Sequence, residues 1–165
     1  MSLIVRDCEE ADIPAVLAIH NDAVLHTTAI WSYVPVDVDN RLALLRDRRA
    51  KGYAFFVVED AGDIAGYAYF GDFRPHDGYH RTVEHSVYVD KGRRGQGIAT
   101  LLLPPLIAAA QAIGKHAMIG AVEANNAASI RLHEKFGFVE AGRLREVGYK
   151  FDRYLDLLLL QKTLG

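Results

Sequence analysis

The sequence predicts a mixed α/β domain. Three observations support this fold class: β-rich and helical stretches alternate along the chain, two early β-rich runs are separated by a short turn, and a strand–loop–helix–strand unit lies in the middle. The chain has 165 residues, about the length of one domain. No internal repeat, low-complexity tract or flexible linker divides it, so we expect residues 1–165 to form a single domain.

In the first half of the chain, apolar runs predict the elements and turn residues predict their ends. Asp12 followed by Pro14 predicts a helix start, and Gly52 predicts the end of a second helix. The turn at 60–63 predicts a hairpin. In order, we expect a strand at 3–6, a helix from 12, a loop at 31–37, a helix at 38–51, and strands at 53–59 and 64–73.

The second half continues the alternation. After an irregular segment at 74–81, we expect a strand at 82–89, a helix starting near Gly97, a strand at 117–122, a helix at 126–136, and strands at 138–144 and 149–162. Pro104 and Pro105 fall inside the first of these helices. Because an internal proline removes a backbone hydrogen bond and clashes with the preceding turn, we expect this helix to be kinked or to restart there.

Composition and charge exclude several protein classes. Half of the residues are hydrophobic and 24% are charged, which is typical of globular proteins rather than disordered ones. The net charge of −2 requires neither a nucleic acid nor a membrane surface as a partner. The apolar stretch 98–113 is too short to span a bilayer, and the first ten residues do not form a signal peptide. A single cysteine, Cys8, excludes an intrachain disulfide. We therefore expect a soluble, cytoplasmic protein.

The segment 84–100 carries the clearest functional signal. A β-rich run ends, a loop with three glycines follows, and a helix begins. Glycines let the backbone approach a ligand closely, and the amide groups at a helix N-terminus bind phosphate. Arg93 and Arg94 add positive charge beside them, so we predict a pyrophosphate site.

Other interpretations of this loop fit the sequence less well. A P-loop would end in Gly-Lys-Ser/Thr, which is absent from the sequence here. A dinucleotide fingerprint starting at Gly95 and Gly97 requires glycine or alanine where Thr100 stands, together with an early βαβ unit. An ordinary turn with solvated arginines is the alternative that stays open.

Two motifs resemble the acetyl-CoA-binding segments of the GNAT superfamily of N-acetyltransferases. The first is Arg94-x-x-Gly97-x-Ala99, and the second follows at the expected separation as Asn125-Asn126-x-x-Ser129-x-x-x-His133-Glu134-Lys135-x-Gly137-Phe138. The resemblance implies the GNAT acyltransferase fold, a twisted, mixed, mostly antiparallel sheet flanked by helices. It also implies acetyl-CoA as the acyl donor, bound at a splay between two central strands.

Within this superfamily, the chain resembles the branch of phosphinothricin acetyltransferase-like and methionine sulfoximine N-acyltransferases. The segments that carry this resemblance are Asn21-Asp22-Ala23-Val24, Thr27-Thr28, Gly71-Asp72-Phe73-Arg74-Pro75, Glu84-His85-Ser86-Val87-Tyr88-Val89 and Gly148-Tyr149-Lys150-Phe151-Asp152-Arg153. It implies direct acetyl transfer to the α-amino group of a small amino acid or analogue, with methionine sulfoximine, methionine sulfone and phosphinothricin as candidates. Two alternatives stay open, a protein or peptide N-acetyltransferase and a non-catalytic acyl-CoA sensor.

The resemblance implies two catalytic residues. An ammonium group has no lone pair, so a base must take its proton, and Glu84 matches the acidic residue of this branch. Glu84 is also suited to anchoring the substrate ammonium, and a structural salt bridge is its alternative. His133 stands where many members have a tyrosine that protonates the departing thiolate, and a structural histidine is equally compatible with the sequence.

The resemblance also implies where the acceptor and the cofactor bind. Arg74, Pro75 and His76 are expected on one side of the acceptor site, with Arg74 binding the carboxylate, and Glu84, His85 and Ser86 on the other. A solvated loop charge is the alternative for Arg74. The expected acetyl-CoA contacts are the backbone of Val87, Tyr88 and Val89, the cradle Arg94, Gly95, Gln96, Gly97, Ile98, Ala99 and Thr100, and the helix positions Asn126 and Ser129. Asn126 also suits a helix N-cap.

Other candidate sites carry weaker signals. No motif surrounds Cys8, so a covalent acyl-enzyme on this thiol is not expected. His76, His80 and His85 fit no standard ligand spacing, so we expect no metal. The branch resembled here commonly forms homodimers, and Trp31, Tyr33 and the segment 149–154 are aromatic-rich candidates for that interface.

Overall fold

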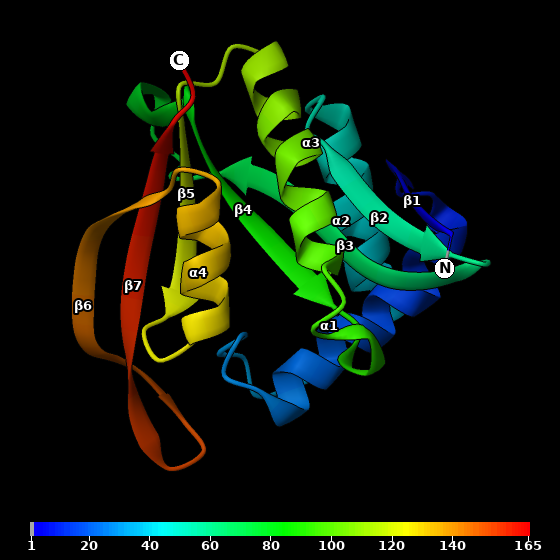
Figure 1. The fold of residues 1–165 in the computed structure, drawn as a ribbon, viewed down its shortest axis with the longest axis horizontal. Coiled ribbons are helices and arrows are strands. Elements are labelled where there is room, and N and C mark those ends of the chain that lie inside the picture. The colour runs from blue at the N-terminus through cyan, green and yellow to red at the C-terminus, as the bar shows by residue number, and fades with distance from the viewer. Residues whose placement is uncertain (1) are drawn as a thin grey trace.

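The computed structural model describes residues 2–165 and contains a seven-stranded sheet covered by helices on both faces (Figure 1). The strand order is β1-β2-β3-β4-β5-β7-β6. Neighbouring strands run antiparallel except for β4 and β5, which run parallel. The predicted fold class, a mixed and mostly antiparallel sheet flanked by helices, is confirmed.

The elements follow one another in nearly the order that the sequence predicts. The strands are β1 (Leu3–Asp7), β2 (Phe55–Asp60), β3 (Asp63–Asp72), β4 (Thr82–Val89), β5 (Ala117–Glu123), β6 (Val139–Lys150) and β7 (Arg153–Thr163), and the helices are α1 (Ile13–His26), α2 (Val38–Ala50), α3 (Ile98–Ala112) and α4 (Ala127–Lys135). The predicted hairpin between β2 and β3 is present, with both Ala61 and Gly62 at positive φ in its turn. Such a turn matches the twist of the two strands.

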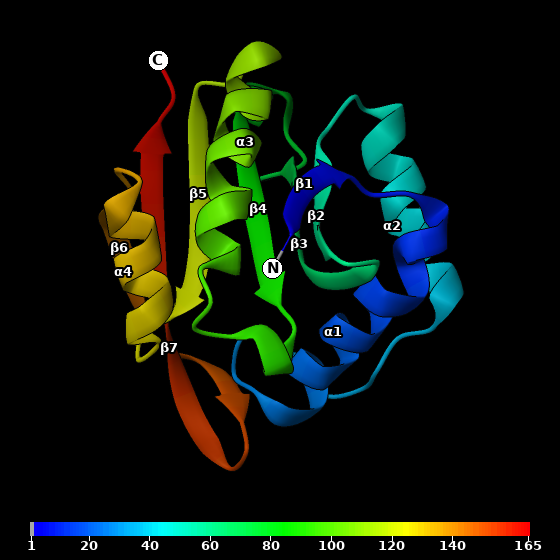
Figure 2. The same cartoon turned by 45° about the vertical axis from the view of Figure 1, so that its right-hand side comes forward.

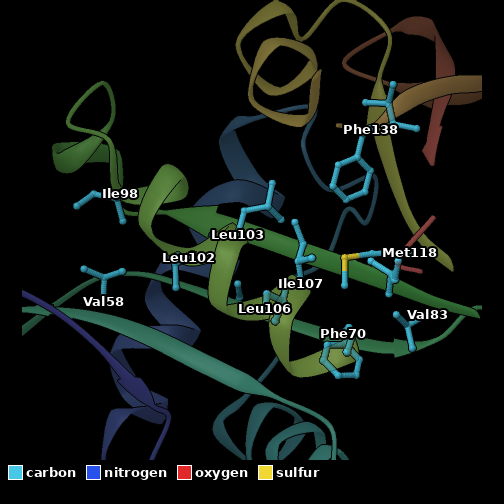
Figure 3. Packing of buried hydrophobic residues seen from close by; sticks show 14 of the residues in the cluster. Val58, Phe70, Val83, Ile98, Leu102, Leu103, Leu106, Ile107, Met118 and Phe138 are labelled. Carbon is cyan, nitrogen blue, oxygen red and sulfur yellow. The ribbon is translucent and has the colours of Figure 1, made fainter. Parts of the chain in front are cut away.

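Two hydrophobic cores, one on each face of the sheet, hold the helices in place. The larger lies under α3, where Leu102, Leu103 and Leu106 are fully buried against the sheet (Figure 3). The smaller lies under α1 and α2 and includes Val16, Leu45 and Tyr67. Because both faces are covered, the central strands read as apolar runs instead of strict alternation. Among residues 2–165, none of the helices combines the length and the apolarity needed to cross a membrane.

Helix α3 runs unbroken through Pro104 and Pro105, so the predicted restart does not occur. Pro104 is exposed and Pro105 half-buried, whereas Leu102, Leu103 and Leu106 are buried. The two prolines therefore lie toward solvent, where water can satisfy the carbonyl groups that lose their amide partners. The buried leucines on the opposite face stabilise the helix in spite of these missing hydrogen bonds.

The last two strands differ from the prediction. Tyr149 and Lys150 belong to β6, and the chain reverses at Phe151 and Asp152, which both have positive φ. The sequence signals this turn poorly, because phenylalanine rarely occupies the left-handed region. A register shift between Leu144 and Gly148 separates the tip of the β6–β7 hairpin from its base, and this tip projects beyond the rest of the sheet (Figure 1).

A splay between β4 and β5 opens the middle of the sheet. Their parallel pairing covers only Thr82 to His85 on β4 and Ala117 to Gly120 on β5, although both strands continue further. Beyond this point β4 stays paired with β3, up to Val89. Since backbone groups along a strand point alternately to its two neighbours, the splay turns part of the β4 backbone toward an open space. Figure 2 shows the two strands diverging.

Candidate active site

The splay opens into a cavity of about 960 Å³. Its walls come from β4 and β5, the start of α3, helix α4 and the loop after α1. It brings together fifteen of the residues that the sequence predicts for the site: Glu84, His85, Ser86, Val87, Tyr88, Val89, Arg94, Gly95, Gly97, Ile98, Ala99, Thr100, Asn126, Ser129 and His133. Segments that are far apart in the sequence thus meet around one cavity.

The side chains of β4 divide this cavity into two sides. Glu84, Ser86 and Tyr88 lie on the face of the sheet that α1 and α2 cover, because Tyr88 pairs with Tyr67 and packs against the smaller core. His85 and Val87 lie on the opposite face, under α3 and α4. The open splay connects the two sides, so one ligand can pass between the strands.

The glycine loop and the start of α3 form a phosphate-binding geometry. Gly95 and Gly97 have φ values of +75° and +78°, a left-handed conformation that disfavours other residues. Gly97 is the N-cap of α3 and has no side chain that could cover the free amide groups of the first turn. These amides and the positive end of the helix dipole therefore face the cavity, where they can bind an anion.

The two arginines of this loop differ in how firmly a carboxylate of the protein holds them. Arg93 forms an ion pair with the carboxylate of Asp60, which fixes it to the turn between β2 and β3. Arg94 is about half exposed, and its nearest carboxylate oxygen, on Asp22, lies 3.6 Å away. A pair this long, with its arginine half in solvent, contributes little energy, so Arg94 is the arginine of this loop that can turn toward a phosphate.

Glu84 lies half-buried on the side of the cavity that faces α1 and α2. Burial raises the pKa of its carboxyl above the ordinary value, and the positive charge of Arg74 opposes this shift. A carboxyl whose pKa moves toward neutrality is a better proton acceptor for an amine, because a general base works best with a pKa near the working pH. The Glu84 carboxylate and the Arg74 guanidinium thus interact as an anion and a cation.

His85 and His133 form a buried pair across the splay. Their Nε2 atoms lie 2.9 Å apart, and His133 Nδ1 lies 2.6 Å from the carbonyl oxygen of Ser129. Because a carbonyl only accepts, His133 carries its proton on Nδ1 and accepts on Nε2 from His85. Gly120 makes room for the pair, since an added Cβ would lie 2.7 Å from His133 Nε2.

Both imidazoles are neutral near neutral pH. Burial, together with the neighbouring His133, lowers the pKa of His85 to about 3. Burial also lowers the pKa of His133, although its bond to the Ser129 carbonyl opposes the shift. Both nitrogens of His133 are thus engaged, and its single proton is on Nδ1. Before His133 can donate a proton to a ligand from Nε2, that nitrogen has to gain a proton and its hydrogen bond with His85 has to break.

Asn126 directly precedes helix α4, and its side chain caps the helix. Its Oδ1 atom accepts a hydrogen bond from the Ser129 backbone amide at 3.1 Å. Asn126 and Ser129 both line the cavity, so the capping role and the predicted cofactor contact are compatible.

Four predicted residues lie outside the cavity. Arg74, Pro75 and His76 follow β3, where the Arg74 guanidinium stacks over the Phe73 ring at 4.9 Å. The positive charge of Arg74 nonetheless lowers the pKa of Glu84, so the two groups interact electrostatically. The remaining residue, Gln96, directs its side chain toward the carbonyl of Gly92.

Several cavity residues have no counterpart in the sequence-based predictions. Thr28 and Ala29 lie in the loop after α1, and Arg153 lies at the start of β7. Glu123, at the end of β5, is 6% exposed, and its Oε1 atom is buried without a hydrogen-bond partner among residues 2–165. Three of them had a signal in the sequence: Thr28 and Arg153 stand in segments that carry the family resemblance, and Glu123 is an acidic residue ending an apolar strand. Ala29 reaches the cavity through tertiary packing alone.

Cys8 is buried away from the cavity, and burial raises the pKa of its thiol to about 12, so it is not a nucleophile near neutral pH. No group of three or more potential metal ligands gathers anywhere in residues 2–165.

Comparison with known proteins agrees with this geometry. Residues 17–138 match the model of the acetyltransferase (GNAT) family. The L-methionine sulfoximine/L-methionine sulfone acetyltransferase of Pseudomonas aeruginosa is 50% identical over 99% of this chain and 96% of its own. Two solved structures are also similar. An acetyltransferase from Salmonella typhimurium with its cofactor acetyl-CoA has a TM-score of 0.98 at 46% identity, covering 100% of this chain and 95% of that one. A ribosomal-protein-alanine N-acetyltransferase from Brucella melitensis has a TM-score of 0.95 at 48% identity, covering 97% and 99%.

The matched residues include the glycine loop and α4, the two segments on which the resemblance rests. The family model covers most of the chain, and the relatives cover nearly all of it. The family prediction is confirmed: this chain belongs to the GNAT family of acetyltransferases.

Proposed function

We propose that this enzyme transfers an acetyl group from acetyl-CoA to the α-amino group of a small amino acid or analogue, with methionine sulfoximine and methionine sulfone as first candidates. The observation that carries the proposal is the half-buried Glu84, with a raised pKa and Arg74 close by, on the acceptor side of the splay. The name of the Pseudomonas aeruginosa relative supports the substrate class. We also propose that the enzyme acts in the cytoplasm.

The cavity fits acetyl-CoA at both ends. The left-handed glycines, the amides of the first turn of α3 and Arg94 are suited to its pyrophosphate. Asn126 and the exposed edge of β4 are suited to the amide groups of its pantetheine arm. When bound, acetyl-CoA supplies the thioester carbonyl that an amine attacks.

The residues of this chain then carry the proton transfer and the positioning. Glu84 takes the proton that the substrate ammonium must lose before its nitrogen has a lone pair. The β4 backbone at the splay offers amide donors to a developing oxyanion. Arg74 balances the substrate carboxylate. The role of His133 as proton donor to the leaving thiolate stays a prediction. It requires that Nε2 of His133 first gain a proton and leave its hydrogen bond with His85.

A panel assay of thiol release tests the proposed function. Acetyl-CoA is supplied with methionine sulfoximine, methionine sulfone, phosphinothricin, the common amino acids and an alanine-initiated peptide. We expect the sulfoximine and the sulfone to be acetylated fastest. Preference for the peptide would favour the second candidate, a protein N-acetyltransferase, which the name of the Brucella melitensis structure supports. Binding of acetyl-CoA without any turnover would favour a sensor domain.

Arg74 gives a test of carboxylate binding. The Arg74→Ala variant loses the cation whose charge acts on Glu84, so we expect the KM for amino acids to rise while the KM for acetyl-CoA stays nearly unchanged. Steady-state kinetics with each substrate varied in turn measures both. An equal KM for methionine sulfone and for its decarboxylated amine in the wild-type enzyme would contradict the assignment.

We also propose that the enzyme is a homodimer. Tyr33, Phe151 and Tyr154 are 61%, 53% and 65% exposed and lie on or near the projecting β6–β7 tip, an unusual concentration of exposed aromatic surface. Light scattering at micromolar concentration should give twice the chain mass of 18.3 kDa. A mass equal to that of a single chain would contradict the dimer.

A further inference from the structure

The segment Gly148-Tyr149-Lys150-Phe151-Asp152-Arg153 carries part of the family resemblance, yet the acetyl-transfer chemistry leaves most of it without a role. Only Arg153 lines the cavity. Gly148 and Lys150 are both buried, and their spacing of two residues on β6 places them on the same face of the strand. They contact the loop between α1 and α2.

Lys150 is a buried lysine whose hydrogen bonds all go to backbone carbonyls, and its Nζ also lies 5.1 Å from the centre of the Phe151 ring. It is 3% exposed, and its Nζ donates hydrogen bonds to the carbonyls of Val24 and Thr27 at 2.6 Å each, and to the carbonyl of Ile30. These partners are 120 to 126 residues away in the sequence. A cation at the C-terminal end of α1 is favoured by the helix dipole and satisfies carbonyls that the helix leaves free. Burial lowers the pKa of Lys150, which reflects the cost of keeping this charge inside.

Two further contacts fix the same loop to β6. The ring of Trp31 lies so close over Gly148 that an added Cβ would be 2.5 Å from its carbons, and Trp31 Nε1 donates to the Thr28 carbonyl at 2.8 Å. The hydroxyl of Tyr33 donates to the Tyr149 carbonyl. The loop is therefore held from its start at Thr27 to Tyr33 in its middle. Figures 1 and 2 show the segment after α1 beside the β6–β7 tip.

The loop held in this way is a wall of the active site. Thr27, Thr28 and Ala29 line the cavity, whereas Trp31 does not. Two of the three carbonyls that Lys150 binds, those of Thr27 and Ile30, bracket this lining segment. The proposed acetyl-CoA contacts lie in other elements, namely the glycine loop, the start of α3 and α4.

We propose that Lys150 is a positioning residue for the amino-acid acceptor. By holding the carbonyls of Val24, Thr27 and Ile30, it fixes the loop 27–30 as the wall of the acceptor side. Trp31, seated on Gly148, completes the attachment. The proposal rests on the proposed amino-acid acetyltransferase function. Lys150 itself does not line the cavity, so its role is to position the loop and not to take part in acetyl transfer.

The Lys150→Met variant tests the proposal with two independent readouts. It keeps a long apolar side chain and removes the ammonium donor. Trp31 is the single tryptophan of the chain, so its fluorescence reports the loop alone. We expect acrylamide to quench Trp31 more strongly in the variant, and the KM for methionine sulfone to rise about tenfold, as for losing a charge-assisted hydrogen bond. The KM for acetyl-CoA should stay within about twofold of wild type.

Lys115→Met is the matched control. Lys115 also donates to a backbone carbonyl, that of His80, but it lies away from the cavity. It should leave both the quenching and the two KM values unchanged. Circular dichroism and light scattering on each variant check that the fold and the assembly match the wild type.

The Gly148→Ala variant tests the Trp31 attachment of the loop and leaves Lys150 unchanged. Its methyl group would displace the Trp31 ring, so quenching and the acceptor KM should rise again. Gly142→Ala on the same strand is its control, because an added Cβ there meets nothing within 4 Å. This second pair keeps the proposal testable if Lys150→Met does not fold.

The outcomes separate this proposal from the proposed function. A rise in quenching together with a rise in the acceptor KM alone supports the positioning role. Unchanged quenching, an unchanged acceptor KM, or an equal rise in both KM values overturns it. If the wild-type enzyme acetylates no amino acid, the proposed function fails and the acceptor role of Lys150 fails with it, even where the quenching shows that Lys150 holds the loop.

Discussion

Replacing Glu84 by glutamine is expected to lower kcat about 10²- to 10⁴-fold, the range typical of a lost general base. Glutamine keeps the shape of the side chain but cannot take a proton from the substrate ammonium. Since the pyrophosphate cradle lies in other residues, acetyl-CoA should still bind. Stopped assays of product formation give kcat, and a thermal shift with acetyl-CoA shows whether binding survives.

The dependence of kcat/KM on pH also tests Glu84 as the general base. The carboxylate is the active form of a base, so kcat/KM should fall as the pH drops through the pKa of Glu84, which burial raises. Arg74 lowers this pKa, and its removal in Arg74→Ala should move the acid limb of the profile to higher pH. In Glu84→Gln the limb should disappear.

Glu140→Gln is a suitable control for the loss of one carboxylate. Glu140 is exposed on β6 and does not line the cavity, so its replacement should leave kcat and the profile unchanged. Turnover of Glu84→Gln close to wild type across the pH range would exclude Glu84 as the base and leave it the role of an ammonium anchor, whose loss raises KM instead.

The sequence predicts best what lies in one contiguous segment. The cradle at 94–100 is readable because its glycines, its arginine and its helix start are consecutive, and the structure gives them the expected backbone conformation. The same holds for the N-cap at Asn126, where the capping residue directly precedes its helix. In both cases local backbone geometry determines the site, and local geometry is what residue type specifies.

Long-range packing is what the sequence does not reveal. Nothing near Lys150 indicates that its charge binds carbonyls more than a hundred residues away, or that Gly148 is needed for the Trp31 ring. The pairing of His85 with His133 depends on the parallel register of β4 with β5 and on the small size of Gly120. The unbroken α3 shows the same limit, because tertiary burial of its leucines outweighs the local effect of two prolines.

Replacing Gly97 by aspartate should abolish the stabilisation of the protein by acetyl-CoA. A ligand at about 100 times its Kd stabilises the native state by about 2.7 kcal/mol, which in a domain of this size is a Tm increase of about 5–10 °C. In Gly97→Asp, a carboxylate would lie among the amides that receive the pyrophosphate, so this increase should fall to nearly zero. Thermal melting with and without acetyl-CoA measures it.

Gly97→Asn separates the charge from the backbone conformation. Asparagine has the shape of aspartate, tolerates the left-handed φ of +78° comparatively well, and carries no charge. An added Cβ at this position meets nothing within 4 Å, so neither variant creates a clash. Aspartate is also a favourable N-cap, so the ligand-free protein should melt no lower with aspartate than with asparagine. We therefore expect Gly97→Asn to keep most of the acetyl-CoA shift. If both variants keep it in full, the pyrophosphate does not bind at the start of α3; if both lose it equally, backbone strain and not charge controls the site.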